Sequence, residues 1–115
     1  MSATGGSGDG GLIEFFGGHK IIANGGTFDA TGGLDGGDIN LDATLQLNAK
    51  GTVLATGIGD DGGTITLTTP TKVKVNGGSF DATGDDDDGL ITVTHCTGGI
   101  GGGSFNPAAV VNVVC

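Results

Sequence analysis

The residues of this chain that could hold a metal ion are aspartates set among glycines. They occur in four short segments: Asp9, Asp35, Asp60 with Asp61, and Asp85 to Asp88. Carboxylate oxygens are the ligands that Ca²⁺ prefers, and a bound cation would relieve repulsion between neighbouring carboxylates. The spacing matches neither the glycine-rich calcium-binding nonapeptide nor the EF-hand loop. Two interpretations stay open, a solvated acidic edge and a weak Ca²⁺ site made of Asp35, Asp60, Asp61, Asp85, Asp86, Asp87 and Asp88.

Cys96 and Cys115 are the only cysteines, and an even number allows one disulfide. Aligning VVNVVC, which ends at Cys115, with ITVTHC, which ends at Cys96, sets one sulfur above the other on stacked strands. The Cα separation there would be about 5 Å, which suits a disulfide. A bridge between two copies of the chain and a pair of buried free thiols are the alternatives.

His19 and His95 are the candidate catalytic bases or metal ligands, because histidine titrates near neutral pH and binds transition metals. They fall at different positions of the repeat described below, and neither a Cys/His metal spacing nor a serine constellation accompanies them. The chain has no arginine, and its basic residues are Lys20, Lys50, Lys72 and Lys74. We expect no enzymatic activity, and no cofactor other than weakly bound Ca²⁺.

The elements that must position these residues come from a 26-residue repeat. Four isoleucines, each close behind glycine and an acidic segment, mark it: Ile13, Ile39, Ile65 and Ile91. A second apolar column follows two residues later: Phe15, Leu41, Leu67 and Val93. A third column follows near the end of each repeat, if the fourth repeat has lost one residue: Phe28, Leu54, Phe80 and Phe105.

Within each repeat apolar and polar residues alternate, as in Ile65-Thr66-Leu67-Thr68, which is typical of strands with one buried face. Glycine-rich segments separate the alternating stretches and supply tight turns. The sequence therefore predicts an all-β, right-handed parallel β-solenoid with three short strands per coil. We expect one domain over residues 1–115, with a partial leading coil at 1–12 and coils at about 13–38, 39–64, 65–90 and 91–115.

The two ends of such a column should carry unpaired strand edges, which invite pairing with another chain. No amphipathic cap is evident at either end, and the chain finishes on the apolar stretch AAVVNVVC. Four valines of this stretch are the candidate assembly residues: Val110, Val111, Val113 and Val114. A heterologous contact between such ends that does not close produces an open polymer.

The charge and composition of the chain limit its possible partners and the size of its core. The net charge is -9, so no basic patch is expected to neutralise nucleic-acid phosphates, and nucleic acid is not an expected partner. No apolar run is long enough to insert into a membrane. The chain has only five aromatic residues, all Phe, and 27 glycines, so we expect its core to be narrow.

The pattern GGLIEFFGGHKIIANGGTFDATGGLDGGDINL resembles the repeats of filamentous-haemagglutinin-like exoproteins and related secreted bacterial β-strand-repeat proteins. The resemblance covers roughly Ala3 to Phe105. It implies a right-handed parallel β-helix that is secreted or exposed on the cell surface, with an adhesive or scaffolding role. Those proteins are typically much longer arrays than four coils, and self-assembly would restore the length.

We therefore expect the structural subunit of an extracellular filament, whose partner is a second copy stacked head to tail. The alternative is a segment of a larger secreted adhesin that contacts surfaces or glycans through its flat faces. A third hypothesis is ice binding through an outward threonine array, Thr66, Thr68, Thr92 and Thr94. The same columns carry Glu14, Phe16, Asn40 and Asp42, which interrupt a regular lattice.

Overall fold

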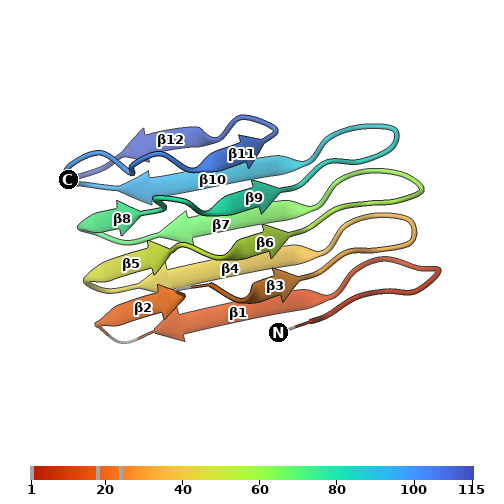
Figure 1. Cartoon of the computed structure of the whole chain (residues 1–115), viewed down its shortest axis with the longest axis horizontal. Coiled ribbons are helices and arrows are strands. Elements are labelled where there is room, and N and C mark those ends of the chain that lie inside the picture. The colour runs from red at the N-terminus through yellow and green to blue at the C-terminus, as the bar shows by residue number, and fades with distance from the viewer. Residues whose placement is uncertain (1, 18, 24) are drawn as a thin grey trace.

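A computed structural model describes residues 2–17, 19–23 and 25–115 of the chain. The described residues form twelve short strands and no helix, wound into a parallel β-solenoid of about four turns (Figure 1). Every strand pairing is parallel, and each strand lies beside its counterpart from the neighbouring coil. The strands make three walls around a narrow core.

The first wall has five strands, β1 (Leu12–Gly17), β4 (Asp38–Ala43), β7 (Thr64–Thr68), β10 (Leu90–His95) and β12 (Val110–Val113). The second wall has three, β2 (Lys20–Ala23), β5 (Gln46–Ala49) and β8 (Lys72–Lys74). The third wall has four, β3 (Thr27–Asp29), β6 (Thr52–Leu54), β9 (Ser79–Asp81) and β11 (Ser104–Asn106).

The core consists of columns of equivalent side chains from successive coils, because side chains alternate between the two faces of each strand. The register pairs Ile13 with Ile39, Ile39 with Ile65, and Ile65 with Ile91. Phe15, Leu41, Leu67 and Val93 make the adjoining column of the same wall. In the middle coils these side chains are fully buried, so each coil completes the burial of its neighbours.

The prediction that Leu54 belongs to the column of Phe28 and Phe80 is wrong. Val53 pairs with both phenylalanines and is 1 % exposed, whereas Leu54 pairs with Asp29 and Asp81 and is only half-buried. At the top of this column Phe105 stacks on Phe80 with ring centroids 4.9 Å apart.

The shift at Leu54 has a simple cause in the lengths of the turns. Three residues separate Ala23 from Thr27, but only two separate Ala49 from Thr52. Because side chains alternate, a change of one residue moves the whole strand to the opposite face. The long loop of the second coil carries one residue more, so the isoleucine column stays in step.

Long loops join the third wall to the first wall of the next coil, and we call residues 5–11, 32–37, 57–63 and 84–89 the acidic edge. The loops stack so closely that glycine is required at several positions. A Cβ at Gly63, for example, would collide with the carbonyl oxygen of Gly37 in the coil below. Figure 1 shows these loops at one end of the 39 Å long axis and the second wall at the other.

Candidate functional site

The C-terminal end of the solenoid is an apolar strand with a neighbour on one side only. In β12, Val111 stacks on Val93 and Val113 stacks on His95, so both face the core side of the first wall. Val111 is nevertheless 43 % exposed and Val113 65 % exposed, since the described residues form no coil above them. This rung exposes apolar side chains that the equivalent rungs bury.

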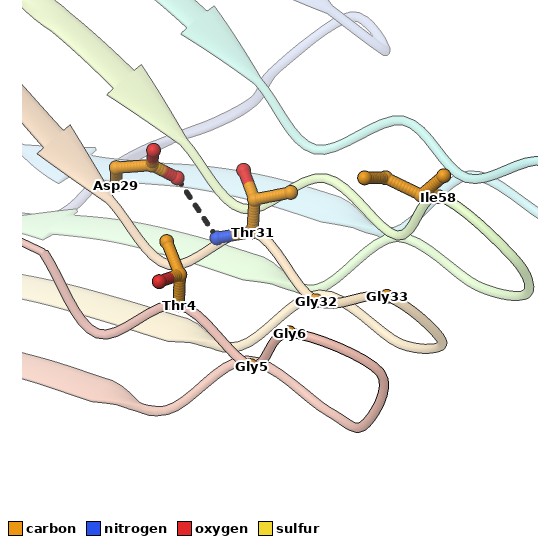
Figure 2. A pocket seen from close by; sticks show the side chains of 8 residues that line it. All are labelled: Thr4, Gly5, Gly6, Asp29, Thr31, Gly32, Gly33 and Ile58. Atoms are coloured by element: carbon orange, nitrogen blue, oxygen red, sulfur yellow. Dashed lines mark hydrogen bonds between the residues drawn. The ribbon is translucent and has the colours of Figure 1, made fainter.

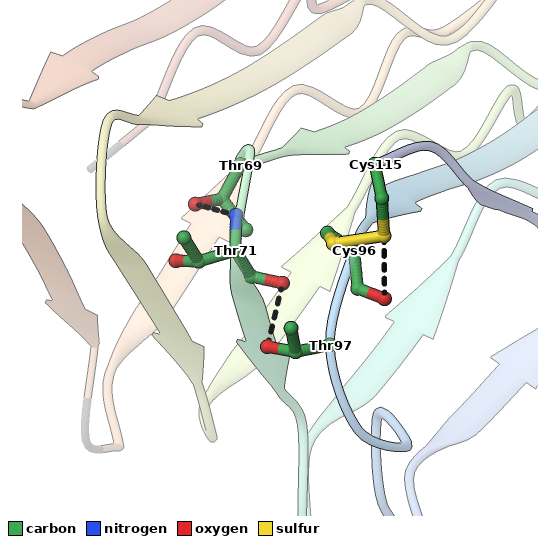
Figure 3. Close-up of a disulfide and its surroundings, with 5 residues drawn as sticks. All are labelled: Thr69, Thr71, Cys96, Thr97 and Cys115. Atoms are coloured by element: carbon green, nitrogen blue, oxygen red, sulfur yellow. Dashed lines mark hydrogen bonds between the residues drawn. A yellow bond between two sulfur atoms is a disulfide. The ribbon is translucent and has the colours of Figure 1, made fainter.

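A disulfide holds the end of β12 in place. Cys96, which follows β10, is bonded to Cys115 with a Cα–Cα distance of 4.9 Å (Figure 3). The Val114 N–H also donates a hydrogen bond to the His95 carbonyl oxygen. The two cysteines thus pair within one chain, and the final strand is attached to the strand beneath it.

The N-terminal end presents the outer edge of β1. Phe15 is partly buried and packs edge-on against Phe28, with ring centroids 5.5 Å apart. On the outward face, Leu12 is 55 % and Phe16 73 % exposed. The lower edge of the third wall is covered differently, because Ser2 pairs with Asp29 and the segment from Ser2 to Gly5 runs beneath β3.

Outward positions of the first wall are more polar between these two ends. β4 presents Asp38, Asn40 and Asp42, and β7 presents only threonines. The threonines considered for ice binding face outward in pairs, Thr66 beside Thr92 and Thr68 beside Thr94, and Asn40 and Asp42 continue the same columns. Leu90 is an exposed apolar exception in β10, and the other outward apolar residues lie in the two terminal strands and at Val114.

At the acidic edge, aspartates form a ladder from coil to coil. The Asp35 N–H donates to Asp9 Oδ1 at 3.3 Å, and the Asp61 N–H donates to Asp35 Oδ1 at 3.0 Å. Asp61 Oδ1 is itself buried and has no hydrogen-bond partner. Each carboxylate of this ladder therefore satisfies the loop above it until Asp61, where the pattern stops.

The carboxylates proposed as calcium ligands fall into two groups that share Asp61. Ligand oxygens of Asp35, Asp60 and Asp61 lie within 4.8 Å of one another, and so do those of Asp61, Asp86 and Asp87. Asp85 and Asp88 belong to neither group, and Asp88 Oδ1 instead accepts a hydrogen bond from the Gly84 N–H.

Crowding at this edge changes the titration of one residue. The carboxylate of Asp61, followed by that of Asp35, raises the pKa of Asp60 above its ordinary value, and desolvation adds to the shift. The dominant cause is repulsion between like charges. This geometry agrees with a solvated acidic edge, and it also brings together the oxygens that a weak Ca²⁺ site would use.

The two histidines lie in different environments. His95 is 3 % exposed, faces the core between Thr69 and Val113, and its Nδ1 has no hydrogen-bond partner. His19 is exposed at a corner, where its backbone carbonyl oxygen accepts hydrogen bonds from Leu45 and Gln46. The structure does not bring them together as a catalytic or metal-binding pair.

A shallow groove of about 230 Å³ opens beside the N-terminal segment (Figure 2). Its walls are mostly glycine backbone and threonine, and Ile58, which is 69 % exposed, forms one lip. The one carboxylate that lines it, Asp29, accepts a hydrogen bond from the Thr31 N–H at 2.9 Å. The Thr31 hydroxyl shares a hydrogen bond with the Thr56 hydroxyl at 2.9 Å.

No protein-family model, curated protein or solved structure matches this chain. The resemblance to filamentous-haemagglutinin-like repeats therefore stays a prediction from the sequence. Within the described part of the chain, no helix is long and apolar enough to cross a membrane. Within that same part of the chain, β1 and β12 are the outermost strands of the first wall.

Proposed function

We propose that this protein is the structural subunit of an extracellular filament, in which copies stack head to tail and continue the solenoid. One observation carries the proposal: among the described residues, β1 and β12, which hold the first and last rungs of the inward columns of the first wall, have a neighbouring strand on one side only. β12 exposes valines that point along the core columns, and β1 begins the same columns. Apolar surface of this kind, next to unpaired backbone groups, favours addition of another strand.

Extending the observed register across the junction defines the pairing between two copies. Val110 aligns with Thr92 and, through the preceding coils, with Glu14. Val111 would then stack on Phe15 of the next copy, and Val113 would lie over Gly17.

The outward face of the junction is complementary as well. In the same register Asn112 lies opposite Phe16 of the next copy, with Val110 and Val114 diagonal to it. Diagonal neighbours on a sheet are within reach of an aromatic ring. Phe16, which is 73 % exposed in the monomer, would therefore cover two valines that are also exposed.

The three walls do not meet equally well. In a head-to-tail stack the third wall would continue from β11 to the segment of the next copy that includes Ser2, and the first wall would continue from β12 to β1. The second wall stops one level below the other two walls. Its uppermost contact is the hydrogen bond that the Val75 N–H donates to the Ile100 carbonyl oxygen. Each junction would leave this wall one strand short, and each copy would add five rungs, about 24 Å, along the axis.

Electron microscopy tests assembly directly. Fibres one subunit wide are expected, with an axial repeat of about 24 Å set by five rungs at the strand spacing. Val113→Asp should abolish them, because a carboxylate in the junction would be desolvated without a partner. Ile58→Asp is the matched control, since Ile58 is similarly exposed, at 69 %, but belongs to the loop between β6 and β7 and to neither β1 nor β12. A soluble monomer at high concentration would overturn the proposal.

Disulfide trapping tests the register. A mixture of Asn112→Cys and Phe16→Cys proteins should cross-link on oxidation, because Cα atoms opposite each other on adjacent strands lie within about 4.4–6.8 Å. Asn112→Cys mixed with Glu14→Cys is the control, displaced by two residues along the strand. Equal trapping of both mixtures would mean that the ends meet without this register.

The second candidate function is a segment of a larger secreted adhesin that binds glycans or other surfaces. It is supported by the flat outward face of β4 and β7, which presents asparagine, aspartate and threonine side chains suited to hydrogen bonding. Binding of the Val113→Asp monomer to a glycan array, lost on changing Asn40 and Thr66 to alanine, would favour this function.

A further inference from the structure

All four basic residues of the chain gather on the second wall. Lys20 opens β2, Lys72 and Lys74 flank Val73 in β8, and Lys50 directly follows β5. Because Ile21, Leu47 and Val73 point inward and are buried, the lysines of the strands point outward. Segments 19–23, 45–51 and 70–78, which build this wall and its corners, contain no acidic residue.

The acidic edge is the opposite in charge and in position. It carries eight of the 13 acidic residues, Asp9, Asp35, Asp60, Asp61, Asp85, Asp86, Asp87 and Asp88. Figure 1 places these loops and the strands β2, β5 and β8 at opposite ends of the 39 Å long axis. A strongly acidic chain has thus separated its few positive charges from most of its negative ones.

We infer that the second wall of one copy binds the acidic edge of another, so that filaments lie side by side along the long axis of the subunit. Charge complementarity supports a second copy as the partner, because both surfaces belong to the same chain. Both also repeat at one rung per coil, about 4.8 Å, so they stay in phase along a filament. The contact is heterologous and extends into open rows.

This lateral contact rests on the proposed filament. An exposed ion pair contributes little by itself, and the net charge of -9 opposes association of isolated subunits. Along a filament the same contact is repeated at every subunit, and linked weak contacts add up to strong attachment. We therefore expect bundles of filaments and no side-by-side dimers of monomeric protein.

The chain itself indicates a substitution that the wall tolerates. In the middle coil, Gln46 and Asn48 occupy the outward positions that Lys72 and Lys74 occupy in the next coil. The variant with Lys20, Lys72 and Lys74 changed to Gln should therefore fold and form filaments. Thr66→Glu, Ser79→Glu and Thr94→Glu, combined, is the control, because it adds the same negative charge at outward positions of the other walls.

Negative-stain microscopy and low-speed pelleting at varied NaCl test the inference. Wild-type bundles, with filaments spaced by roughly the long axis, should form at low salt and separate near 0.5 M, where the Debye length is about 4 Å. The lysine variant should give single filaments at every salt concentration and pellet about tenfold less, while the control still bundles.

Four results would overturn the inference, and they are distinguishable. Single wild-type filaments at low salt, or bundles that survive both high salt and loss of the lysines, would exclude the lateral contact and leave the filament intact. Single filaments that bind added polyglutamate through the lysine wall would replace the second copy with an acidic polymer as the partner. Absence of filaments of any width would exclude the filament and the lateral contact together.

Discussion

The middle coils and the C-terminal rung contain the same kind of column in two different states. Ile65 and Val93 lie between neighbours above and below and are completely buried, whereas Val111 and Val113 have a neighbour below only and are 43 % and 65 % exposed. The residue types and the parallel pairing are alike. In a solenoid, burial therefore comes from the adjacent coil and not from the strand itself.

The sharpest way to break this comparison is to truncate one side chain in each region. Ile65→Ala should lower the free energy of unfolding by about 2–5 kcal/mol, because it leaves a cavity between two coils. Val113→Ala should change the stability of the monomer by at most about 0.5 kcal/mol, as expected for an exposed position. Urea unfolding of both variants at low protein concentration measures the difference.

Equal losses in the two variants would mean that the terminal rung is as tightly integrated as the middle coils. The measurement must be made below the concentration at which filaments form. Above it, Val113 should become as sensitive as Ile65, because the next copy would bury it.

Removing the disulfide should increase the difference in stability between the C-terminal rung and the middle coils. Cys96→Ser with Cys115→Ser opens a link between residues 19 apart in sequence, and loop entropy of that length corresponds to at most about 3 kcal/mol. The loss should be concentrated in β12, whose amide hydrogens should exchange faster than those of β7. Hydrogen exchange read residue by residue distinguishes this from a uniform loss, which would show that β12 and the middle coils unfold together.

The sequence predicted much of the fold because the repeat is visible in spacing alone. Every pairing along the isoleucine column follows from the interval of 26 residues. Leu54 could not be placed that way, because a shortened turn and a lengthened loop offset each other within one coil. The alternation Thr52-Val53-Leu54 is apolar at two successive positions, so pattern alone does not say which one faces inward.

The candidate site divides in the same way. The segment VVNVVC pointed to an apolar final strand and to the Cys96–Cys115 pairing, because both depend on alignment with the preceding coil. The sequence also predicted an acidic edge, but the burial of His95 and the division of the carboxylates into two groups that share Asp61 depend on how side chains turn within crowded rungs, and spacing carries no such information.

Alanine substitutions at Val53 and Leu54 test the corrected register. Val53→Ala should cost about 2 kcal/mol, because two buried methyl groups are lost between Phe28 and Phe80. Leu54→Ala should cost less than about 1 kcal/mol, since Leu54 faces outward beside Asp29 and Asp81. Thermal unfolding of both proteins gives the order, and the reverse order would restore Leu54 to the core column.

The smallest expected effect concerns the acidic edge. Its loops stack as regularly as the core strands do, but stacking brings like charges together there, whereas in the core it buries apolar side chains. The pKa of Asp60 is raised in the folded state, so the folded protein takes up a proton at higher pH than the unfolded chain does. Stability linked to Asp60 therefore appears as the pH falls through the raised value. It is complete below the unfolded value of 3.8 and is lost again as the pH rises.

Unfolding midpoints between pH 3 and pH 7, compared for wild type and Asp60→Asn, should differ most at neutral pH, where the variant is the more stable of the two. A variant that is less stable at pH 7 would show that the carboxylate is stabilising and that repulsion does not dominate there.

Repeating the series with CaCl₂ and NaCl at equal ionic strength separates the two interpretations of these loops. Equal effects of both salts identify a solvated acidic edge, because screening depends on ionic strength alone. A rise specific to CaCl₂ that disappears in Asp60→Asn identifies coordination by the carboxylates around Asp61.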